Sequence, residues 1–338
     1  MTDDAIRTLL PFETGDLPLP AGKWAFLGAV GDSLVGDIFA GADLVCEQPG
    51  RGAFLDLQDA GFATTPALAD APAGRFDGAL VLLGKHRRLN QARIARAARM
   101  VRPGAPVVFS GPKSLGAAAI RKWLAARLAP LGALAKHHGL VVWFAAEANA
   151  LADVALAQTT PAPGLVAAPG MFSAERIDAG SALLAGHIDG RIAGAVADFG
   201  AGWGYLGAEI LARGRPETLD LVEAHKPSLD AALANLRPRA GTVPVAAHWL
   251  DLTRETPPRR YDVVVMNPPF HAGRRGDPDL GRAFIAAAAA ALVANGRLLM
   301  VANRHLPYED DIRARFARMW LCAQAQGFKV IEAMRPVR

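Results

Sequence analysis

A stiff polar loop follows an apolar, β-branched run in the C-terminal half of the chain. The run reads Tyr-Asp-Val-Val-Val-Met over residues 261–266, and directly after it come Asn267, Pro268, Pro269 and Phe270. The run predicts a buried strand, and the prolines end it because neither has a backbone N–H and both have φ fixed near about −65°. The Asn267 side-chain oxygen and the Pro268 carbonyl could accept hydrogen bonds from a flat amine while Phe270 stacks on its ring. Taken alone, these residues could equally form a plain Pro-Pro turn.

A glycine-rich turn lies earlier in the chain, after the short apolar run of residues 195–199. Asp198 stands before three alternating glycines, Gly200, Gly202 and Gly204. Glycines where a strand enters a helix let a ligand approach the backbone closely, and they leave helix N-terminal amides free to bind an anionic group. A second apolar run ends at Glu223, about 20 residues beyond the turn, where α/β folds place a carboxylate against a ribose hydroxyl. Together these features predict a nucleoside-containing cofactor.

The glycine turn alone does not identify that cofactor. Residues 202–207 also satisfy G-x-G-x-x-G, the dinucleotide pattern, so an NAD-dependent oxidoreductase is a rival interpretation. Asp198 and the Asn-Pro-Pro-Phe loop distinguish the two, because together they resemble the class I S-adenosylmethionine-dependent methyltransferases that act on exocyclic amines. That resemblance implies that the aspartate and the glycines hold the methionine end of S-adenosyl-L-methionine. It also implies that Glu223 binds the ribose, and that the loop at Asn267 holds the amine next to the cofactor.

Alternating strands and helices must position these loops. In the C-terminal half the strand candidates are residues 195–199, 219–223, 243–247, 261–266 and 297–302, with helical patterns between them. This alternation predicts an α/β fold with a parallel, doubly wound sheet. The N-terminal half repeats the layout. Its strand candidates are residues 24–30, 41–46, 76–83, 105–110 and 140–145, and its helix candidates are residues 90–100 and 114–128.

The N-terminal repeat lacks both chemical loops. Residues 28–32 read Gly-Ala-Val-Gly-Asp where three alternating glycines would stand, and residues 83–88 read Leu-Gly-Lys-His-Arg-Arg where the amine-holding loop would stand. The simplest interpretation is a duplicated methyltransferase-like fold in two domains. Residues 1–158 would form a degenerate domain that serves as an RNA-binding platform. A proline-rich linker at 159–168 would then lead to a catalytic domain over residues 169–338.

The basic residues are unevenly distributed along the chain. The formal net charge is only +5, yet residues 78–146 contain no Asp or Glu and twelve Lys or Arg. Within this stretch Arg93, Arg96 and Arg99 recur at i, i+3 spacing and would share one helix face. A concentrated positive field attracts a polyanion with salt-dependent affinity, which favours nucleic acid over a merely solvated surface. The residues expected to contact RNA are Lys85, Arg87, Arg88, Arg93, Arg96, Lys113, Arg274 and Arg275.

Composition limits the remaining possibilities. The 338 residues are 51% hydrophobic and 20% charged, which suits a globular chain of two domains. No uninterrupted apolar run reaches the roughly 18 residues that span a bilayer. The N-terminus also lacks a basic-then-apolar signal pattern, so we expect a cytoplasmic protein. Cys46 and Cys322 are the only cysteines and form no metal-ligand spacing, so we expect no metal.

Taken together, the two halves resemble the bacterial ribosomal RNA guanine-N2 methyltransferases, especially the family that acts on 16S rRNA of the small subunit. The resemblance rests on residues 169–173 (Pro-Gly-Met-Phe-Ser), 177–181 (Ile-Asp-Ala-Gly-Ser), 267–271 with Gly273, 301–308 and 327–330. It implies two tandem Rossmann-like domains, S-adenosyl-L-methionine as cofactor, and ribosomal RNA or the small ribosomal subunit as partner. Separately from the resemblance, we expect a monomer.

The same resemblance assigns three further residues to the cofactor site. Phe172 and Ser173 would lie near the cofactor, and Asp251 would contact its adenine. A core aromatic is the alternative for Phe172, and a helix cap is the alternative for Asp251.

The expected reaction is in-line transfer of a methyl group to the N2 amine of guanine. The lone pair of that nitrogen is delocalised into the ring, so acceptors on both amine hydrogens would favour a more tetrahedral nitrogen and disperse its developing charge. Positioning of the amine supplies much of the remaining acceleration. Asn-Pro-Pro-aromatic loops serve other planar amines in the wider superfamily. A guanine of 23S rRNA, adenine N6 and a protein glutamine amide therefore remain alternatives.

Overall fold

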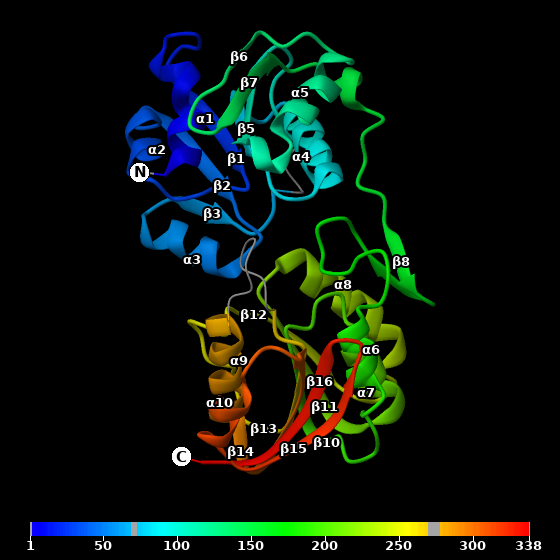
Figure 1. Ribbon diagram of the computed structural model, residues 1–338. Coiled ribbons are helices and arrows are strands. Elements are labelled where there is room, and N and C mark those ends of the chain that lie inside the picture. Colours follow the sequence, from blue (N-terminus) through cyan, green and yellow to red (C-terminus); the bar gives the residue numbers. More distant parts are fainter. Residues whose placement is uncertain (1, 69–72, 270–277, 338) are drawn as a thin grey trace. The chain divides into compact units, whose positions relative to one another are not determined.

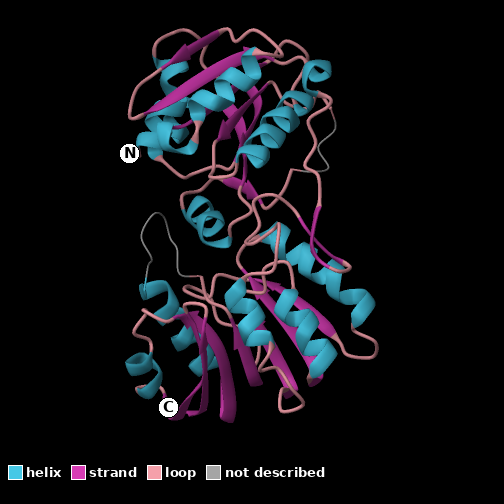
Figure 2. Cartoon of the chain, turned by 45° about the vertical axis from the view of Figure 1, so that its right-hand side comes forward, coloured by secondary structure: helices cyan, strands magenta, loops and turns pink. Residues whose placement is uncertain are grey.

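The chain folds into two compact α/β units, and the division between them falls between Ala157 and Gln158 (Figure 1). This computed structural model describes residues 2–68, 73–269 and 278–337. Each unit contains one seven-stranded sheet with a hydrophobic cluster on either face, and helices cover both faces (Figure 2). The architecture is therefore the repeated α/β layout that the alternation of strands and helices predicts.

The first unit arranges its sheet in the order β3-β2-β1-β4-β5-β7-β6. Its strands are β1 (Gly22–Leu27), β2 (Ala42–Glu47), β3 (Ala63–Thr65), β4 (Gly78–Leu82), β5 (Pro106–Pro112), β6 (Gly132–Leu134) and β7 (Gly139–Ala145). Its helices are α1 (Asp3–Glu13), α2 (Ser33–Ile38), α3 (Arg51–Asp59), α4 (Arg87–Met100) and α5 (Ala117–Ala125). Strands β1 to β5 are parallel, and β7 is antiparallel to both of its neighbours.

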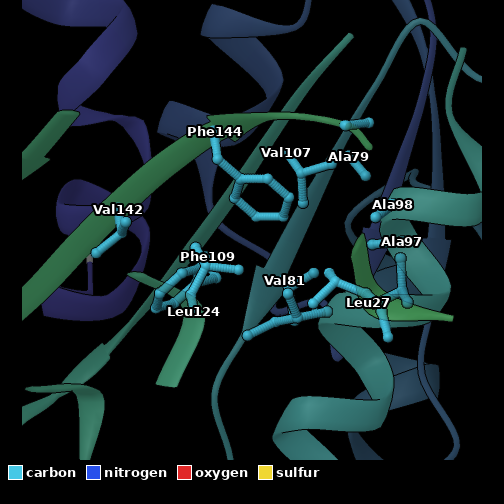
Figure 3. Packing of buried hydrophobic residues seen from close by; sticks show 14 of the residues in the cluster. Leu27, Ala79, Val81, Ala97, Ala98, Val107, Phe109, Leu124, Val142 and Phe144 are labelled. Atoms are coloured by element: carbon cyan, nitrogen blue, oxygen red, sulfur yellow. The ribbon is translucent and has the colours of Figure 1, made fainter. Parts of the chain in front are cut away.

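Small residues on α4 let this helix lie close to the sheet. Figure 3 shows part of the cluster that α4 and α5 bury, including Leu27, Val81, Ala97, Ala98, Phe109, Leu124 and Phe144. Each buried Leu or Phe contributes about 1.5–3 kcal/mol relative to an exposed position. Helices α1, α2 and α3 cover the opposite face, where Phe12, Trp24 and Phe39 meet edge to face. The first unit therefore has a complete core of its own.

The second unit repeats this order as β12-β11-β10-β13-β14-β16-β15. Its sheet strands are β10 (Ala193–Phe199), β11 (Arg215–Glu223), β12 (Val245–Trp249), β13 (Tyr261–Met266), β14 (Leu292–Asn303), β15 (Phe316–Ala325) and β16 (Phe328–Pro336). Its helices are α6 (Ala179–Ala185), α7 (Tyr205–Arg213), α8 (Lys226–Leu236), α9 (Pro278–Ala291) and α10 (Glu309–Arg313). Strands β10 to β14 are parallel, and β16 is antiparallel to both β14 and β15.

Both sheets are parallel through five strands, as expected, but each ends in an antiparallel pair that the alternation of strands and helices did not predict. In the second unit only Gln326 and Gly327 separate β15 from β16, and both have positive φ (52° and 82°). A two-residue turn of this kind joins antiparallel neighbours, whereas a parallel connection needs a crossover of a dozen or more residues. In the first unit the corresponding turn includes His137 and His138, also at positive φ (49° and 55°).

Residues 159–168, expected to form a linker, contain the antiparallel pair β8 (Thr159–Ala162) and β9 (Leu165–Ala167). Ala162, Leu165 and Ala167 are buried against Trp203 of the glycine turn. This hairpin therefore packs as part of the second unit. Among the helices of the described residues, we find none that is long and apolar enough to cross a membrane.

Candidate functional site

A cavity of about 430 Å³ lies at the carboxyl ends of the central strands of the second unit. The residues that line it come from the ends of β10, β11, β12 and β13 and the turns after them, from α9, and from the segment between β9 and α6. They include Phe172, Gly200, Gly202, Val222, Glu223, Leu250, Asp251, Leu252, Asn267, Pro268, Pro269 and Phe284. In open α/β sheets ligands bind at this end of the strands, and the volume is that of a small-molecule site. The structure thus gathers Asn267, the glycines and two carboxylates around one cavity.

A second, smaller cavity of about 40 Å³ adjoins the first. Phe172, Gly200, Gly202 and Asn267 line both cavities. The remaining walls of the smaller one are Ser173, Asp178, Ser181, Ala201, Trp203, Tyr205 and Leu206. Gly200 and Gly202 have φ of +75° and +55°, a conformation that side chains rarely adopt, so glycine is required at this turn.

Two carboxylates face the larger cavity from neighbouring strand ends. Glu223 accepts hydrogen bonds from the N–H groups of Gly202 (2.9 Å) and His225 (2.8 Å), which fix its position at the end of β11. Burial raises the pKa of Glu223 above its ordinary value. Asp251 accepts from the N–H (2.9 Å) and the hydroxyl (2.6 Å) of Thr253, so it opens a turn after β12. Both carboxylates can accept hydrogen bonds from hydroxyl or amine groups of a ligand.

The side-chain amide of Asn267 is bonded on its NH2 side. Its Nδ2 donates to Asp178 Oδ2 (3.0 Å) and to Ser181 Oγ (2.8 Å). Its Oδ1 is buried and has no hydrogen-bond partner among the described residues. Leaving a buried acceptor unpaired costs about 1–3 kcal/mol, so this atom marks a place where a ligand N–H fits. Sequence reasoning missed Asp178 and Ser181 as site residues, although residues 177–181 carry part of the family resemblance and Asp-x-x-Ser is the pattern of a helix N-cap.

Asp198 and Gly204 lie behind the cavity wall rather than on it. Asp198 is fully buried, and neither of its oxygens has a hydrogen bond of normal geometry among the described residues. Burial raises the pKa of Asp198 to about 7, and the N–H of Gly207 only partly offsets that rise. A Cβ at Gly204 would lie 2.6 Å from the Leu236 side chain, so this glycine allows the turn to pack on α8.

Phe172 is exposed rather than buried in the core. It lines both cavities with 58% of its surface accessible. Its carbonyl accepts a hydrogen bond from Trp203 Nε1 (2.9 Å), which ties it to the glycine turn. Ser173, the next residue, has φ of +47° and lines the smaller cavity. Phe270, the aromatic of the Asn-Pro-Pro-Phe loop, lies outside the described residues.

The basic residues of the first unit divide into two groups. Lys85, Arg87 and Arg88 are exposed, and Lys113 lines a groove of about 420 Å³ together with Arg121 and Lys122. Arg96 instead forms an ion pair with the buried Glu47. Arg93 lies beside Gly28, and burial lowers the pKa of its guanidinium. Arg93 and Arg96 share one helix face as expected, but that face lies against the carboxyl ends of β1 and β2, next to Gly28 and Glu47, rather than in solvent. Arg274 and Arg275 lie outside the described residues.

No group of three or more His, Cys, Asp or Glu side chains is placed to hold a metal ion in residues 2–68, 73–269 and 278–337.

Three comparisons with known proteins agree on one family. The family model described as "Methyltransferase small domain" matches residues 163–332. The Ribosomal RNA small subunit methyltransferase C of Pseudomonas paraeruginosa is 33% identical over 79% of this chain and 81% of its own length. The protein of the same name from Stutzerimonas stutzeri is 30% identical over 93% of this chain and 95% of its own length.

A solved structure extends the similarity to both units. The T. Thermophilus 16S rRNA N2 G1207 methyltransferase, in complex with AdoMet and guanosine, is 26% identical to this chain. It superposes with a TM-score of 0.77 and covers 95% of this chain and 90% of its own. The prediction of two tandem Rossmann-like methyltransferase domains is confirmed.

Proposed function

This chain belongs to the Ribosomal RNA small subunit methyltransferase C family, and we infer from that membership and from the cavity that it methylates 16S rRNA. It transfers a methyl group from S-adenosyl-L-methionine to the exocyclic N2 amine of a guanine. We further propose that its target is the guanine equivalent to G1207, the nucleotide that the solved relative modifies. The observation that supports this most directly is the buried Oδ1 of Asn267 beside the cavity, which has no hydrogen-bond partner in residues 2–68, 73–269 and 278–337.

The residues present fit S-adenosyl-L-methionine, which supplies a methyl group made electrophilic by its sulfonium. We propose that Glu223 accepts from the ribose hydroxyls and that Asp251 accepts from the adenine amine. The apolar side chains of Val222, Leu250 and Leu252 line the space between these carboxylates. Gly200 and Gly202 allow the methionine end to approach the backbone, next to Phe172 and Ser173. Asp198 and Gly204 do not line the cavity. We propose that they contribute by fixing the conformation of the glycine turn.

The amine is held by acceptors alone in this proposal. Asn267 Oδ1 and the Pro268 carbonyl each accept one hydrogen of the guanine amine, so that its nitrogen lone pair points out of the ring plane. The same two oxygens then stabilise the positive charge that develops on nitrogen. Groups of this kind, fixed before reaction, typically contribute 10²–10³-fold to the rate. Pro269 keeps the loop stiff, and Phe270 is proposed to stack on a guanine that has left its base stack.

No residue needs to remove a proton before transfer, because the amine proton becomes acidic only after the nitrogen has gained the methyl group. Asn267 and Pro268 are therefore sufficient as polar contacts to the reacting nitrogen.

We propose that the first unit binds the RNA backbone. The exposed Lys85, Arg87 and Arg88 lie just after β4, and the groove at Lys113 adds two further cations, Arg121 and Lys122. Basic side chains of this kind contact phosphates and position the substrate without reading its sequence. Arg93 and Arg96, which turn toward Glu47, are not part of this surface. Arg274 and Arg275 are proposed to meet phosphates that flank the target. We propose a monomeric, cytoplasmic enzyme.

One assay tests the function directly. The protein is incubated with radiolabelled S-adenosyl-L-methionine and with small ribosomal subunits or naked 16S rRNA that lack the modification, and the labelled nucleoside is then identified and mapped. We expect N2-methylguanosine at a single position. Label in N6-methyladenosine, in 23S rRNA or in protein would instead support one of the other planar amines. Binding of NADH in place of S-adenosylhomocysteine would support the oxidoreductase.

A further inference from the structure

The side chain of Asn267 is held from behind by the first turn of α6. Nδ2 of Asn267 lies 3.0 Å from Asp178 Oδ2 and 2.8 Å from Ser181 Oγ. Both partners precede Asn267 by more than 80 residues in the chain, and both line the smaller cavity next to it. Asp178 and Ser181 therefore reach the amine-binding loop from a different element.

The carboxylate determines which way the Asn267 amide faces. An amide has one side that donates and one side that accepts, and the two sides have nearly the same shape. An ionised carboxylate can only accept, so the side facing Asp178 must be the NH2 group. Oδ1 is thereby directed away from Asp178, and it is this oxygen that has no partner among the described residues. With the amide reversed, NH2 would face the guanine amine, and two donors would meet.

The same carboxylate oxygen is itself fixed. Asp178 is the N-cap of α6, and its Oδ2 also accepts from the Ser181 N–H at 2.8 Å. Ser181, Leu184 and Ala185 are buried, and α6 packs against β14 and β16. Asp178 is therefore held by the helix that it caps, and it can transmit that rigidity to Asn267.

We propose that Asp178, assisted by Ser181, is the positioning residue that orients Asn267 for methyl transfer. The inference rests on the proposed function, because it concerns the orientation of the group that accepts the guanine amine. A carboxylate on the NH2 side also polarises the amide, and hydrogen bonds linked in series strengthen one another. Asp178 thus makes Oδ1 both correctly directed and a better acceptor.

The test compares Asp178→Ala, Asp178→Asn and Ser181→Ala in the full-length protein. Each is assayed for kcat, for the KM of S-adenosyl-L-methionine, for S-adenosylhomocysteine affinity by calorimetry, and for Tm. We expect Asp178→Ala to lower kcat by about 10²-fold, the effect of losing one fixed transition-state contact, with little change in S-adenosylhomocysteine affinity. Ser181→Ala should lower kcat by about fivefold, because it removes one of the two acceptors of Nδ2, each worth roughly 1 kcal/mol.

Asp178→Asn is the discriminating variant. One oxygen, Oδ2, accepts from both Ser181 and Asn267, so an asparagine whose single oxygen occupies that place can serve both donors. We expect it to restore most of the kcat that Asp178→Ala loses.

Asp32→Ala is the matched control for the loss of a cap. Asp32 caps α2 in the first unit, accepts from the N–H of Leu34 at 3.1 Å and touches neither cavity. Asp32→Ala should lower Tm by about as much as Asp178→Ala does, while its kcat stays unchanged.

Three results would overturn the positioning role. The first is a raised KM for S-adenosyl-L-methionine with normal kcat in Asp178→Ala, since that identifies a cofactor ligand. The second is an Asp178→Asn enzyme as slow as Asp178→Ala. The third is full kcat in Asp178→Ala while the wild type makes N2-methylguanosine. If the wild-type protein makes no N2-methylguanosine at all, the proposed function itself fails.

Discussion

The two sheets have equivalent strands in the same order. Matching the registers of these strands identifies the structurally equivalent residues of the two units. Leu27 pairs with Val81 across β1 and β4, as Phe199 pairs with Met266 across β10 and β13. The residue after Met266 is Asn267, and the residue after Val81 is Leu82, which is buried. The first unit therefore has a core leucine where the second has its proposed catalytic amide.

The backbone of the ligand-binding turn is retained in both units. The N–H groups of Gly28 and Ala29 donate to the Glu47 carbonyl at 3.0 and 3.1 Å. Those of Gly200 and Ala201 donate to the Val222 carbonyl at 2.8 and 3.1 Å. The match continues one residue further. Gln48 accepts from the N–H two residues later at 2.9 Å, as Glu223 does at 2.8 Å. An uncharged amide thus stands in the position of Glu223, the carboxylate proposed to bind the ribose.

The two units differ in what occupies the space at the carboxyl ends of their strands. In the second unit the turns enclose a cavity of about 430 Å³. In the first unit the corresponding end holds the Arg96–Glu47 ion pair, and the Arg93 guanidinium lies beside Gly28. One copy of the fold leaves this end open for a ligand, whereas the other fills it with its own side chains. We therefore expect one molecule of S-adenosyl-L-methionine to bind per chain.

The largest expected effect comes from truncating the matched pair Asn267 and Leu82. Asn267→Ala should reduce methyl transfer by about 10²–10³-fold, because one of the two proposed amine acceptors is lost, while S-adenosylhomocysteine still binds in calorimetry. Leu82→Ala should instead cost about 2–5 kcal/mol of unfolding free energy and leave kcat per folded molecule unchanged. Wild-type turnover in Asn267→Ala would contradict the catalytic assignment and with it the contrast between the units.

A second experiment breaks the ion pair that fills the first unit. Arg96→Ala would remove the ion-pair partner of the Glu47 carboxylate, which is 3% exposed and would retain the Leu68 N–H (2.8 Å) and the nearby Arg93 guanidinium. We expect a loss of up to about 3 kcal/mol in urea unfolding, since a buried carboxylate that loses its ion-pair partner is costly. Arg99→Ala on the same helix is the matched control, because Arg99 is exposed and its loss should change stability by less than about 0.5 kcal/mol. Equal effects of the two variants would show that the pair adds nothing to stability.

A third experiment uses the buried Asp220, whose matched residue in the first unit is Val45. Burial tends to raise the pKa of Asp220, but hydrogen bonds from His248, Arg259 and Tyr261 outweigh it and lower the pKa to about 2. Since the unfolded value is about 3.9, the carboxylate stabilises the folded state above about pH 4, and this stabilisation is lost as pH falls toward 2.

Asp220→Asn should therefore cost about 2 kcal/mol at pH 7 and about half of that at pH 3. Urea unfolding at both values measures the difference, and hydrogen exchange assigns it to the second unit. A loss that is the same at pH 3 and pH 7 would mean that the charge of Asp220 is not what stabilises this sheet.

The smallest expected effect concerns RNA binding by the first unit. Replacing Lys85, Arg87 and Arg88 together with alanine should weaken binding to 16S rRNA by about tenfold. It should also reduce the slope of log affinity against log salt by about 0.7 for each single-stranded phosphate contact that is lost. Arg313→Gln, in the second unit, removes a cation already paired with Asp310 and serves as control. If the triple variant has the wild-type salt slope, these residues are only a solvated surface.

The sequence predicted the catalytic end of the second sheet well because its signals are local. Apolar runs ending in glycines, in Glu223 or in Asn-Pro-Pro mark strand ends, and parallel strands bring their carboxyl ends together. Phe172 and Asp251, expected from resemblance alone, line the same cavity.

Three features could not be predicted because they depend on distant contacts. Strand β15 is rich in Ala, Arg, Met and Gln, which favour helix, and only pairing with β16 makes it a strand. The contact between Asp178 and Asn267 joins segments 89 residues apart. Helical spacing predicted that Arg93 and Arg96 share one face of α4. That this face lies against Glu47 at the end of β2, rather than in solvent, could not be predicted from the spacing.

The hairpin of β8 and β9 has a consequence for anyone who wishes to express the second unit alone. The amide of Asn235 accepts from the Val166 N–H (3.0 Å) and donates to the carbonyls of Val166 and Trp203 (both 2.8 Å). A fragment that begins at residue 169 loses two of these three bonds and exposes the side of the glycine turn at Trp203 against which the hairpin packs. A fragment that begins at Gln158 retains them, so that is where a shortened gene should start.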